Sequence, residues 1–171
     1  MFKLSLLVIA TAGPILAQSP KYAVGRAPTP EEVKALDISV APDGTGLPDG
    51  SGTVAQGKEV YASKCAKCHG GQGQGGDDAP LVGGQGTLRS AKPLKTVGSY
   101  WPYATTLFDY IRRAMPLNQS KSLSNDEVYA AAAFLLNLNG IIPDDAVMNG
   151  QTLPKVMMPN RDGFVTFARG K

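Results

Sequence analysis

The sequence predicts a small all-α domain flanked by irregular N- and C-terminal extensions. Between residues 53 and 140, apolar side chains recur at the spacing of helix faces, and strand signals are absent. Gly (20) and Pro (13) supply 33 of the 171 residues and favour turns outside these helices. This length fits one modest domain rather than a multidomain enzyme.

Composition excludes several classes of protein. The formal net charge is +3 and is spread along the chain, which does not indicate nucleic-acid binding. Hydrophobic residues at 43% and charged residues at 18% indicate neither a disordered tail nor a membrane bundle. Two Cys and one His are too few for the four ligands of a structural zinc site.

The first 17 residues predict a secretory signal peptide. Lys3 gives a short positive start, residues 4–16 are apolar, and Ala17 precedes the expected cleavage site. The apolar segment is short for a bilayer span, and Gly13-Pro14 would interrupt a core helix. We therefore expect export to the periplasm and no stable membrane insertion after cleavage, because no second apolar segment follows.

Residues 18–52 form a Pro- and Gly-rich N-terminal extension with one helical signature. Thr29 can cap a helix and Pro30 suits its first position, which predicts a short helix from Pro30 to about Leu36. The remainder predicts consecutive turns. The extension has too few apolar residues to fold alone, so it either wraps a neighbouring segment or stays mobile.

The first helix of the 53–140 domain should begin at a capping box. Thr53 and Gln56 have the T-x-x-Q spacing of that box, and the helix runs into Cys65. A second helix buries one face between residues 107 and 114 and should stop near Met115, because proline follows.

The third helix should begin at a second capping box, formed by Ser124 and Glu127, and end at Gly140. Residues 141–171 are again Pro-rich and lack periodicity, so they predict a C-terminal extension packed over the domain. Three short helices are too small a core to be stable without a large apolar insert.

Residues 65–69 read Cys-Ala-Lys-Cys-His, the C-x-x-C-H spacing of covalent haem attachment. Two thiols three positions apart on a helical turn can bond the two vinyl groups on one side of a porphyrin. The adjacent imidazole of His69 then takes the proximal position on the iron. The sequence therefore predicts one covalent haem c, attached through Cys65 and Cys68, in the space that the core cannot fill.

Three other uses of these two Cys are less consistent with the sequence. A thioredoxin-like redox motif needs a βαβ setting, which is missing. Zinc lacks ligands. A buried disulfide, which export would permit, is the remaining alternative.

The sixth iron ligand is expected to be a Met. His69 is the only His, which excludes a second imidazole, and no third Cys is present. A His/Met pair raises the reduction potential and suits electron transfer. Met115 and Met158 both precede a proline. Met115, between two helical segments, is the first candidate, and Met158, in the C-terminal extension, is the second.

The C-x-x-C-H motif, followed by Ala79-Pro-Leu-Val-Gly83, Met115-Pro116 and a final amphipathic helix, resembles class I c-type cytochromes over residues 53–140. That family has a three-to-four-helix haem domain, which the resemblance therefore implies here.

The resemblance also implies roles for individual residues. Pro80 would offer its carbonyl to the far nitrogen of His69, as partners of ligating imidazoles do. Leu81 would pack on the haem ring. Gly57 and Tyr61 of the first helix would cross the last helix.

Three further segments are similar to the cytochrome subunits of bacterial sulfite and sulfane dehydrogenases. They are residues 28–32, 98–116 and 153–163. The similarity implies that the electron donor is a molybdenum-containing enzyme that oxidises a sulfur compound in the periplasm. A downstream cytochrome or oxidase would accept the electron. Composition and spacing alone show no sulfur chemistry.

We therefore expect a periplasmic monohaem cytochrome c that carries one electron and is not itself an enzyme. With His69 and Met115 on both axial positions, the iron has no room for a substrate, and the protein sets the potential. Two alternatives stay open. One is a permanently bound redox subunit of the dehydrogenase. The other is a haem enzyme or gas-binding sensor in which Met115 is displaced.

Overall fold

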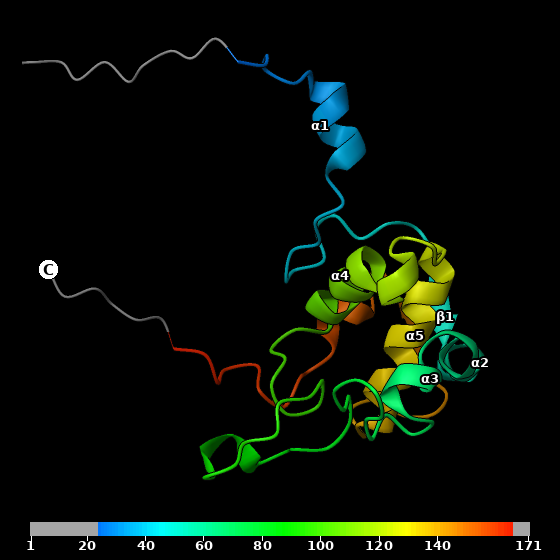
Figure 1. The fold of residues 1–171 in the computed structure, drawn as a ribbon, viewed down its shortest axis with the longest axis vertical. Coiled ribbons are helices and arrows are strands. Elements are labelled where there is room, and N and C mark those ends of the chain that lie inside the picture. Colours follow the sequence, from blue (N-terminus) through cyan, green and yellow to red (C-terminus); the bar gives the residue numbers. More distant parts are fainter. Residues whose placement is uncertain (1–23, 166–171) are drawn as a thin grey trace, which may run out of the picture.

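The computed structural model describes residues 24–165, and the predicted signal peptide at residues 1–17 lies outside them (Figure 1). The described residues form five α-helices and a two-stranded sheet, which confirms the predicted mostly helical class. In chain order the elements are α1 (Pro30–Leu36), β1 (Ser51–Thr53), α2 (Val54–Lys64), α3 (Ala66–His69), α4 (Ala104–Ala114), α5 (Asn125–Leu138) and β2 (Val147–Asn149). Short 3-10 helices lie at Thr87–Arg89, Leu117–Gln119 and Leu153–Lys155. Within residues 24–165, no helix combines the length and apolar character that crossing a membrane requires.

The predicted N-caps of three helices and the predicted end of α4 are confirmed, whereas α5 ends at Leu138, two residues before the expected Gly140. Capping boxes form at Thr29, Thr53 and Ser124, where each side chain accepts a hydrogen bond from the backbone N–H three residues later, at 3.2 to 3.3 Å. The second predicted helix, α4, ends at Ala114 with Met115 as its C-cap. These boundaries follow from local chemistry, which is why the sequence reveals them.

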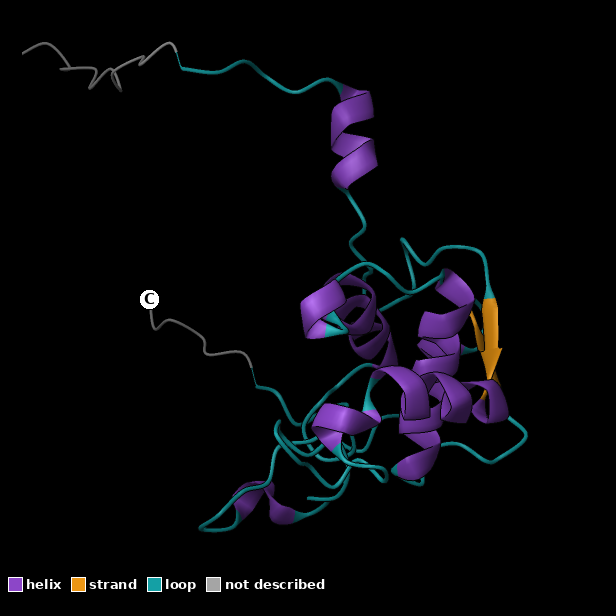
Figure 2. Cartoon of the chain, turned by 45° about the vertical axis from the view of Figure 1, so that its right-hand side comes forward, coloured by secondary structure: helices purple, strands orange, loops and turns teal. Residues whose placement is uncertain are grey.

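The small sheet is an element that the sequence did not indicate. β1 and β2 pair antiparallel, with Ser51 opposite Asn149 and Thr53 opposite Val147. Both strands lie at the edge of the helical body (Figure 2). A three-residue strand is too short to show the alternation by which strands are recognised. The pairing joins the start of α2 to the C-terminal extension.

Helix α5 is the centre of the core. All nine residues from Val128 to Leu136 are buried. The ring of Phe108 on α4 lies 4.4 Å from the ring of Tyr129, centroid to centroid. The C-terminal extension contributes Leu153, Val156 and Met158 to the same core.

Helix α2 crosses α5 at Gly57 and Tyr61. A Cβ atom at position 57 would overlap the carbonyl oxygen of Ala130 and lie 2.7 Å from the Cβ of Phe134. Tyr61 is 1% exposed, and its ring centroid lies 5.2 Å from that of Phe134. The crossing that the family resemblance implies is therefore present, and only glycine permits the backbones to approach this closely.

The N-terminal extension divides into two parts. Its second part runs along the helical body, where the Val40 N–H donates to Asp109 at 3.2 Å and the Tyr129 hydroxyl donates to the Pro48 carbonyl at 2.9 Å. Its first part carries α1, which projects from the body and buries none of its residues (Figure 1). Of the two behaviours expected for this extension, wrapping over a neighbouring segment is therefore seen in its second part, which includes Val40 and Pro48.

Gly57→Ala is expected to lower the free energy of unfolding by about 3 kcal/mol, because the new methyl group must push α2 away from α5. Urea unfolding of the haem-loaded protein measures this change. Gly150→Ala is the matched control, since a Cβ there meets only the Tyr129 hydroxyl at 3.8 Å. The control should change stability by no more than about 0.5 kcal/mol. Equal stability of the two variants would contradict the close crossing.

Candidate functional site

The C-x-x-C-H residues lie on a tight corner between α2 and α3. Helix α2 ends at Lys64, and Cys65 breaks the helical path with φ −122° and ψ −38°. The N–H groups of Cys68 and His69 both donate to the Cys65 carbonyl, at 3.1 and 3.0 Å. One turn of the chain therefore carries both cysteines and the histidine.

The two thiols are free rather than joined in a disulfide. Burial, and secondarily the neighbouring Cys68, raise the pKa of the Cys65 thiol to about 11. This thiol is therefore neutral at physiological pH. Among residues 24–165, no group of three or more His, Cys, Asp or Glu side chains could hold a metal ion.

The His69 imidazole is held by a backbone carbonyl. Its Nδ1 lies 2.9 Å from the carbonyl oxygen of Ala79. Because a carbonyl only accepts, Nδ1 carries a proton, and in the neutral ring Nε2 then keeps its lone pair for a metal. This is the tautomer that an axial ligand of a haem iron requires.

The expected partner of His69 was the carbonyl of Pro80, and this expectation is wrong by one residue. Ala79 precedes a proline and is therefore confined to extended backbone. After the proline, the N–H groups of Leu81 and Val82 both donate to the Gly73 carbonyl, at 2.8 and 3.1 Å. These constraints hold the chain so that the Ala79 carbonyl faces the imidazole.

Tyr61 joins the motif to the core. Its hydroxyl donates to the Gly70 carbonyl at 2.8 Å, one residue beyond His69. Gly70 has φ +78°, a conformation that favours glycine and turns the chain away from α3. Burial is the main reason that the pKa of Tyr61 rises to about 12.

The four methionines in the described residues have different surroundings. Met148 and Met158 are core residues, 5% and 3% exposed, and Met157 is 71% exposed. Met115 is half-buried at the end of α4 and packs against the core, as Cys65 and Leu81 also do. A hydrogen bond links His69 directly to the loop at Ala79. Met115 is related to that loop only through packing against the same core.

These residues fit a haem. Two free thiols on one turn, an imidazole bonded through Nδ1 and a half-buried thioether are the kinds of donor that a His/Met haem c uses. Leu81, which is half-buried against the core, offers an apolar surface that suits a porphyrin face. Sequence reasoning missed Ala79, because its contribution is a backbone carbonyl. The following proline is the one signal that could have indicated it.

A sequence-family model described as cytochrome c oxidase, cbb3-type, subunit III matches residues 52–135. The thiosulfate dehydrogenase of Stutzerimonas stutzeri (strain A1501) is 31% identical over 114 residues, which are 64% of this chain and 34% of that protein. The thiosulfate dehydrogenase of Psychrobacter arcticus (strain DSM 17307 / VKM B-2377 / 273-4) is 28% identical over 113 residues, 60% of this chain and 32% of that protein. The chain thus spans about a third of the length of these curated relatives.

A solved structure is similar over most of the chain. It is a chain of the sulfane dehydrogenase SoxCD from Paracoccus pantotrophus, with 45% sequence identity and a TM-score of 0.79. The match covers 87% of this chain and 74% of the SoxCD chain. It therefore extends well beyond residues 53–140.

The raised pKa of Tyr61 predicts a loss of stability at alkaline pH. Unfolded tyrosine releases its proton near pH 10, whereas folded Tyr61 keeps it to about pH 12. The free energy of unfolding should therefore fall as pH rises between these values. Tyr61→Phe should reduce this slope, while loss of the bond to Gly70 should cost about 1 kcal/mol at neutral pH.

Urea unfolding of the haem-loaded protein across this pH range, followed by circular dichroism, measures the slope. Part of it should persist in the variant, because burial also raises the pKa of Tyr129. An unchanged slope in Tyr61→Phe would contradict the assignment to Tyr61.

Proposed function

The chain belongs to the class I c-type cytochromes of sulfur-compound dehydrogenase systems, and on this premise we propose that it carries one electron from such a dehydrogenase toward the respiratory chain. Its role is electron transfer rather than catalysis. The family binds haem, and we assign one covalent haem c to Cys65 and Cys68. The observation that carries the proposal is the corner at residues 65–69, which presents two free thiols and a His69 tautomer fixed by Ala79.

Each residue of the site has a distinct part in this function. The haem, when bound, supplies one-electron iron chemistry. Cys65 and Cys68 would hold it in place, and His69 and Met115 would ligate the iron. The bond from His69 Nδ1–H to the Ala79 carbonyl orients the imidazole and strengthens it as a donor. Leu81 contributes an apolar wall that keeps water away.

The choice of Met115 over Met158 is supported by burial. Met158 is a core residue, 3% exposed, whereas Met115 is half-buried on the core surface where α4 ends. A neutral thioether in an apolar setting favours the reduced iron and gives a potential suited to accepting electrons. If His69 and Met115 both ligate the iron, no coordination site would remain for a substrate or a gas.

We propose a molybdenum-containing dehydrogenase of a sulfur compound as the electron donor. The sulfur compound is supported by relatives named thiosulfate dehydrogenases and a sulfane dehydrogenase. The molybdenum centre is what the sequence resemblance implies. The electron then passes to a downstream cytochrome or oxidase. Such an exchange between exported proteins takes place in the periplasm, which agrees with the signal peptide expected at residues 1–17.

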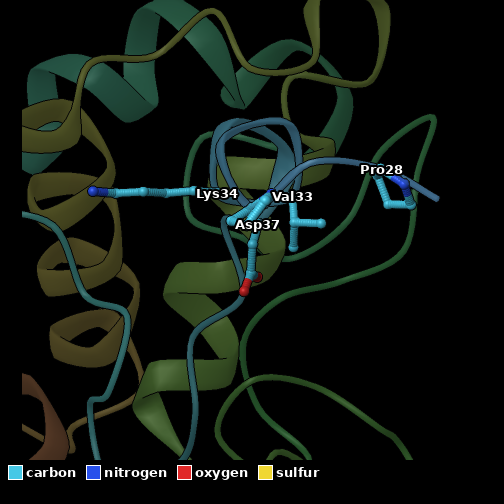
Figure 3. A pocket seen from close by; sticks show the side chains of 5 residues that line it. Pro28, Val33, Lys34 and Asp37 are labelled. Atoms are coloured by element: carbon cyan, nitrogen blue, oxygen red, sulfur yellow. The ribbon is translucent and has the colours of Figure 1, made fainter.

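A second candidate function is that of a redox subunit bound permanently to the dehydrogenase. Helix α1 favours it, because Val33 and Leu36 are 49% and 79% exposed on a helix that buries nothing in its own chain. A seven-residue helix is marginal in water without packing. A shallow hollow beside α1, away from residues 65–69, is lined by Pro28, Pro30, Val33, Lys34 and Asp37 (Figure 3).

Met115→Ala is expected to leave the haem covalently attached, to abolish the far-red thioether-to-iron absorption of the oxidised protein, and to lower the reduction potential. Optical spectroscopy and a redox titration measure these effects. Met157→Ala, at an exposed position, is the control and should change neither. Loss of the band in Met158→Ala but not in Met115→Ala would contradict the assignment. A five-coordinate, high-spin spectrum in the unaltered protein would instead favour a haem enzyme or sensor.

Replacing Val33 and Leu36 with Ser should weaken binding to the donor dehydrogenase if α1 is a subunit contact. We expect the dissociation constant to rise at least about tenfold, about 1.4 kcal/mol. Glu31→Ser is the control, because Glu31 is exposed on the same helix and does not line this hollow. Surface plasmon resonance with the purified dehydrogenase measures the constant, and reduction by ascorbate checks that the haem site is intact. Equal binding by both variants would leave the free carrier as the better description.

A further inference from the structure

Asn139 lies at the C-terminal end of α5 and makes more bonds than a helix cap needs. It is 7% exposed, and its side-chain Nδ2 donates to the Leu135 carbonyl of its own helix at 2.8 Å. The same nitrogen donates to the Leu81 carbonyl at 3.1 Å, and Oδ1 accepts from the Gly83 N–H at 3.3 Å. The last two partners lie 58 and 56 residues earlier in the chain.

Two neighbours support this arrangement. The side chain of Gln85 donates to the backbone carbonyl of Asn139 at 3.0 Å. Gly98 leaves room for the amide, because a Cβ there would overlap Asn139 Oδ1. The amide is thus held by its own helix and by Leu81 and Gly83, in a space that Gly98 leaves open.

The loop that Asn139 holds is the one that orients His69. Ala79 accepts the bond from His69 Nδ1, and Leu81, two residues later, accepts the bond from Asn139. Pro80 lies between them with its φ fixed by the ring, and the N–H groups of Leu81 and Val82 are bonded to Gly73, so the chain between the two contacts is restrained. His69 and Asn139 therefore hold opposite ends of one short, stiff segment.

We propose that Asn139 is a positioning residue that holds the Ala79 carbonyl against His69 and thereby sets part of the reduction potential. This inference rests on the proposed function, in which His69 ligates the haem iron. A strong bond from Nδ1–H makes the imidazole a better donor and favours the oxidised iron. If the loop is released, that bond weakens, and the potential should rise.

Asn137 provides a matched control on the same helix. Its side chain also donates two hydrogen bonds, to the Ile142 carbonyl at 3.0 Å and to Asp144 at 2.8 Å. Neither partner belongs to the loop at residues 79–85. Removing either amide should destabilise the fold, but only the loss of Asn139 should reach His69.

The test compares Asn139→Ala with Asn137→Ala in the full, haem-loaded protein. In Asn139→Ala we expect the His69 Nδ1 proton of the reduced protein to exchange with solvent at least about tenfold faster by NMR. We also expect the equilibrium constant for reduction to rise about tenfold, or about 59 mV for one electron. Asn137→Ala should lower the melting temperature and leave both quantities unchanged. If Asn139→Ala does not load haem, Asn139→Ser takes its place, because a serine hydroxyl can still form one hydrogen bond. The exchange rate and the reduction potential should then shift in the same direction but by less.

The proposal would be overturned if Asn139→Ala were less stable but kept the exchange rate and the potential of the unaltered protein. The same criterion applies to Asn139→Ser where that variant replaces Asn139→Ala. Asn139 would then be only a helix cap. Failure of the proposed function would look different. The unaltered protein would then bind no haem, or His69→Ala would leave its spectrum unchanged.

Discussion

The close crossing of α2 over α5 at Gly57 determines where the rest of the site lies. Contact between the two backbones directs the end of α2, and with it the corner at residues 65–69, relative to the central helix. The far end of α5 holds, through Asn139, the loop that carries the Ala79 carbonyl. The positions of the two thiols and of the Ala79 carbonyl, which orients His69, are thus both fixed relative to α5. This suits a site whose reduction potential depends on a fixed ligand geometry.

The helices were predictable because their determinants are local. Thr53 and Ser124 begin α2 and α5 through capping boxes that the sequence shows directly. The partner of His69 was misplaced by one residue, because a backbone carbonyl has no side-chain identity and its direction depends on the hydrogen bonds around it. Asn139 was not identified, since a polar residue at a helix end resembles an ordinary cap until its distant partners are known.

Some segments of the two extensions pack against the helical body and others leave it, and composition alone does not distinguish the two kinds. Leu153, Val156 and Met158 complete the core, although their spacing follows no helical or strand period. Residues 38–50 run along the helical body, whereas α1 leaves it with its apolar side chains exposed. The first two segments act within the chain, and α1 is the part best suited to a partner.

Covalent attachment of one haem at residues 65–69 is the central claim, and mass spectrometry of the exported protein after acid–acetone extraction tests it most directly. We expect the intact mass to exceed that of the polypeptide by one haem, and the added mass to remain on the peptide that contains Cys65 and Cys68. A polypeptide that loses its haem on extraction, or a peptide with these two residues joined as a disulfide, would contradict the claim.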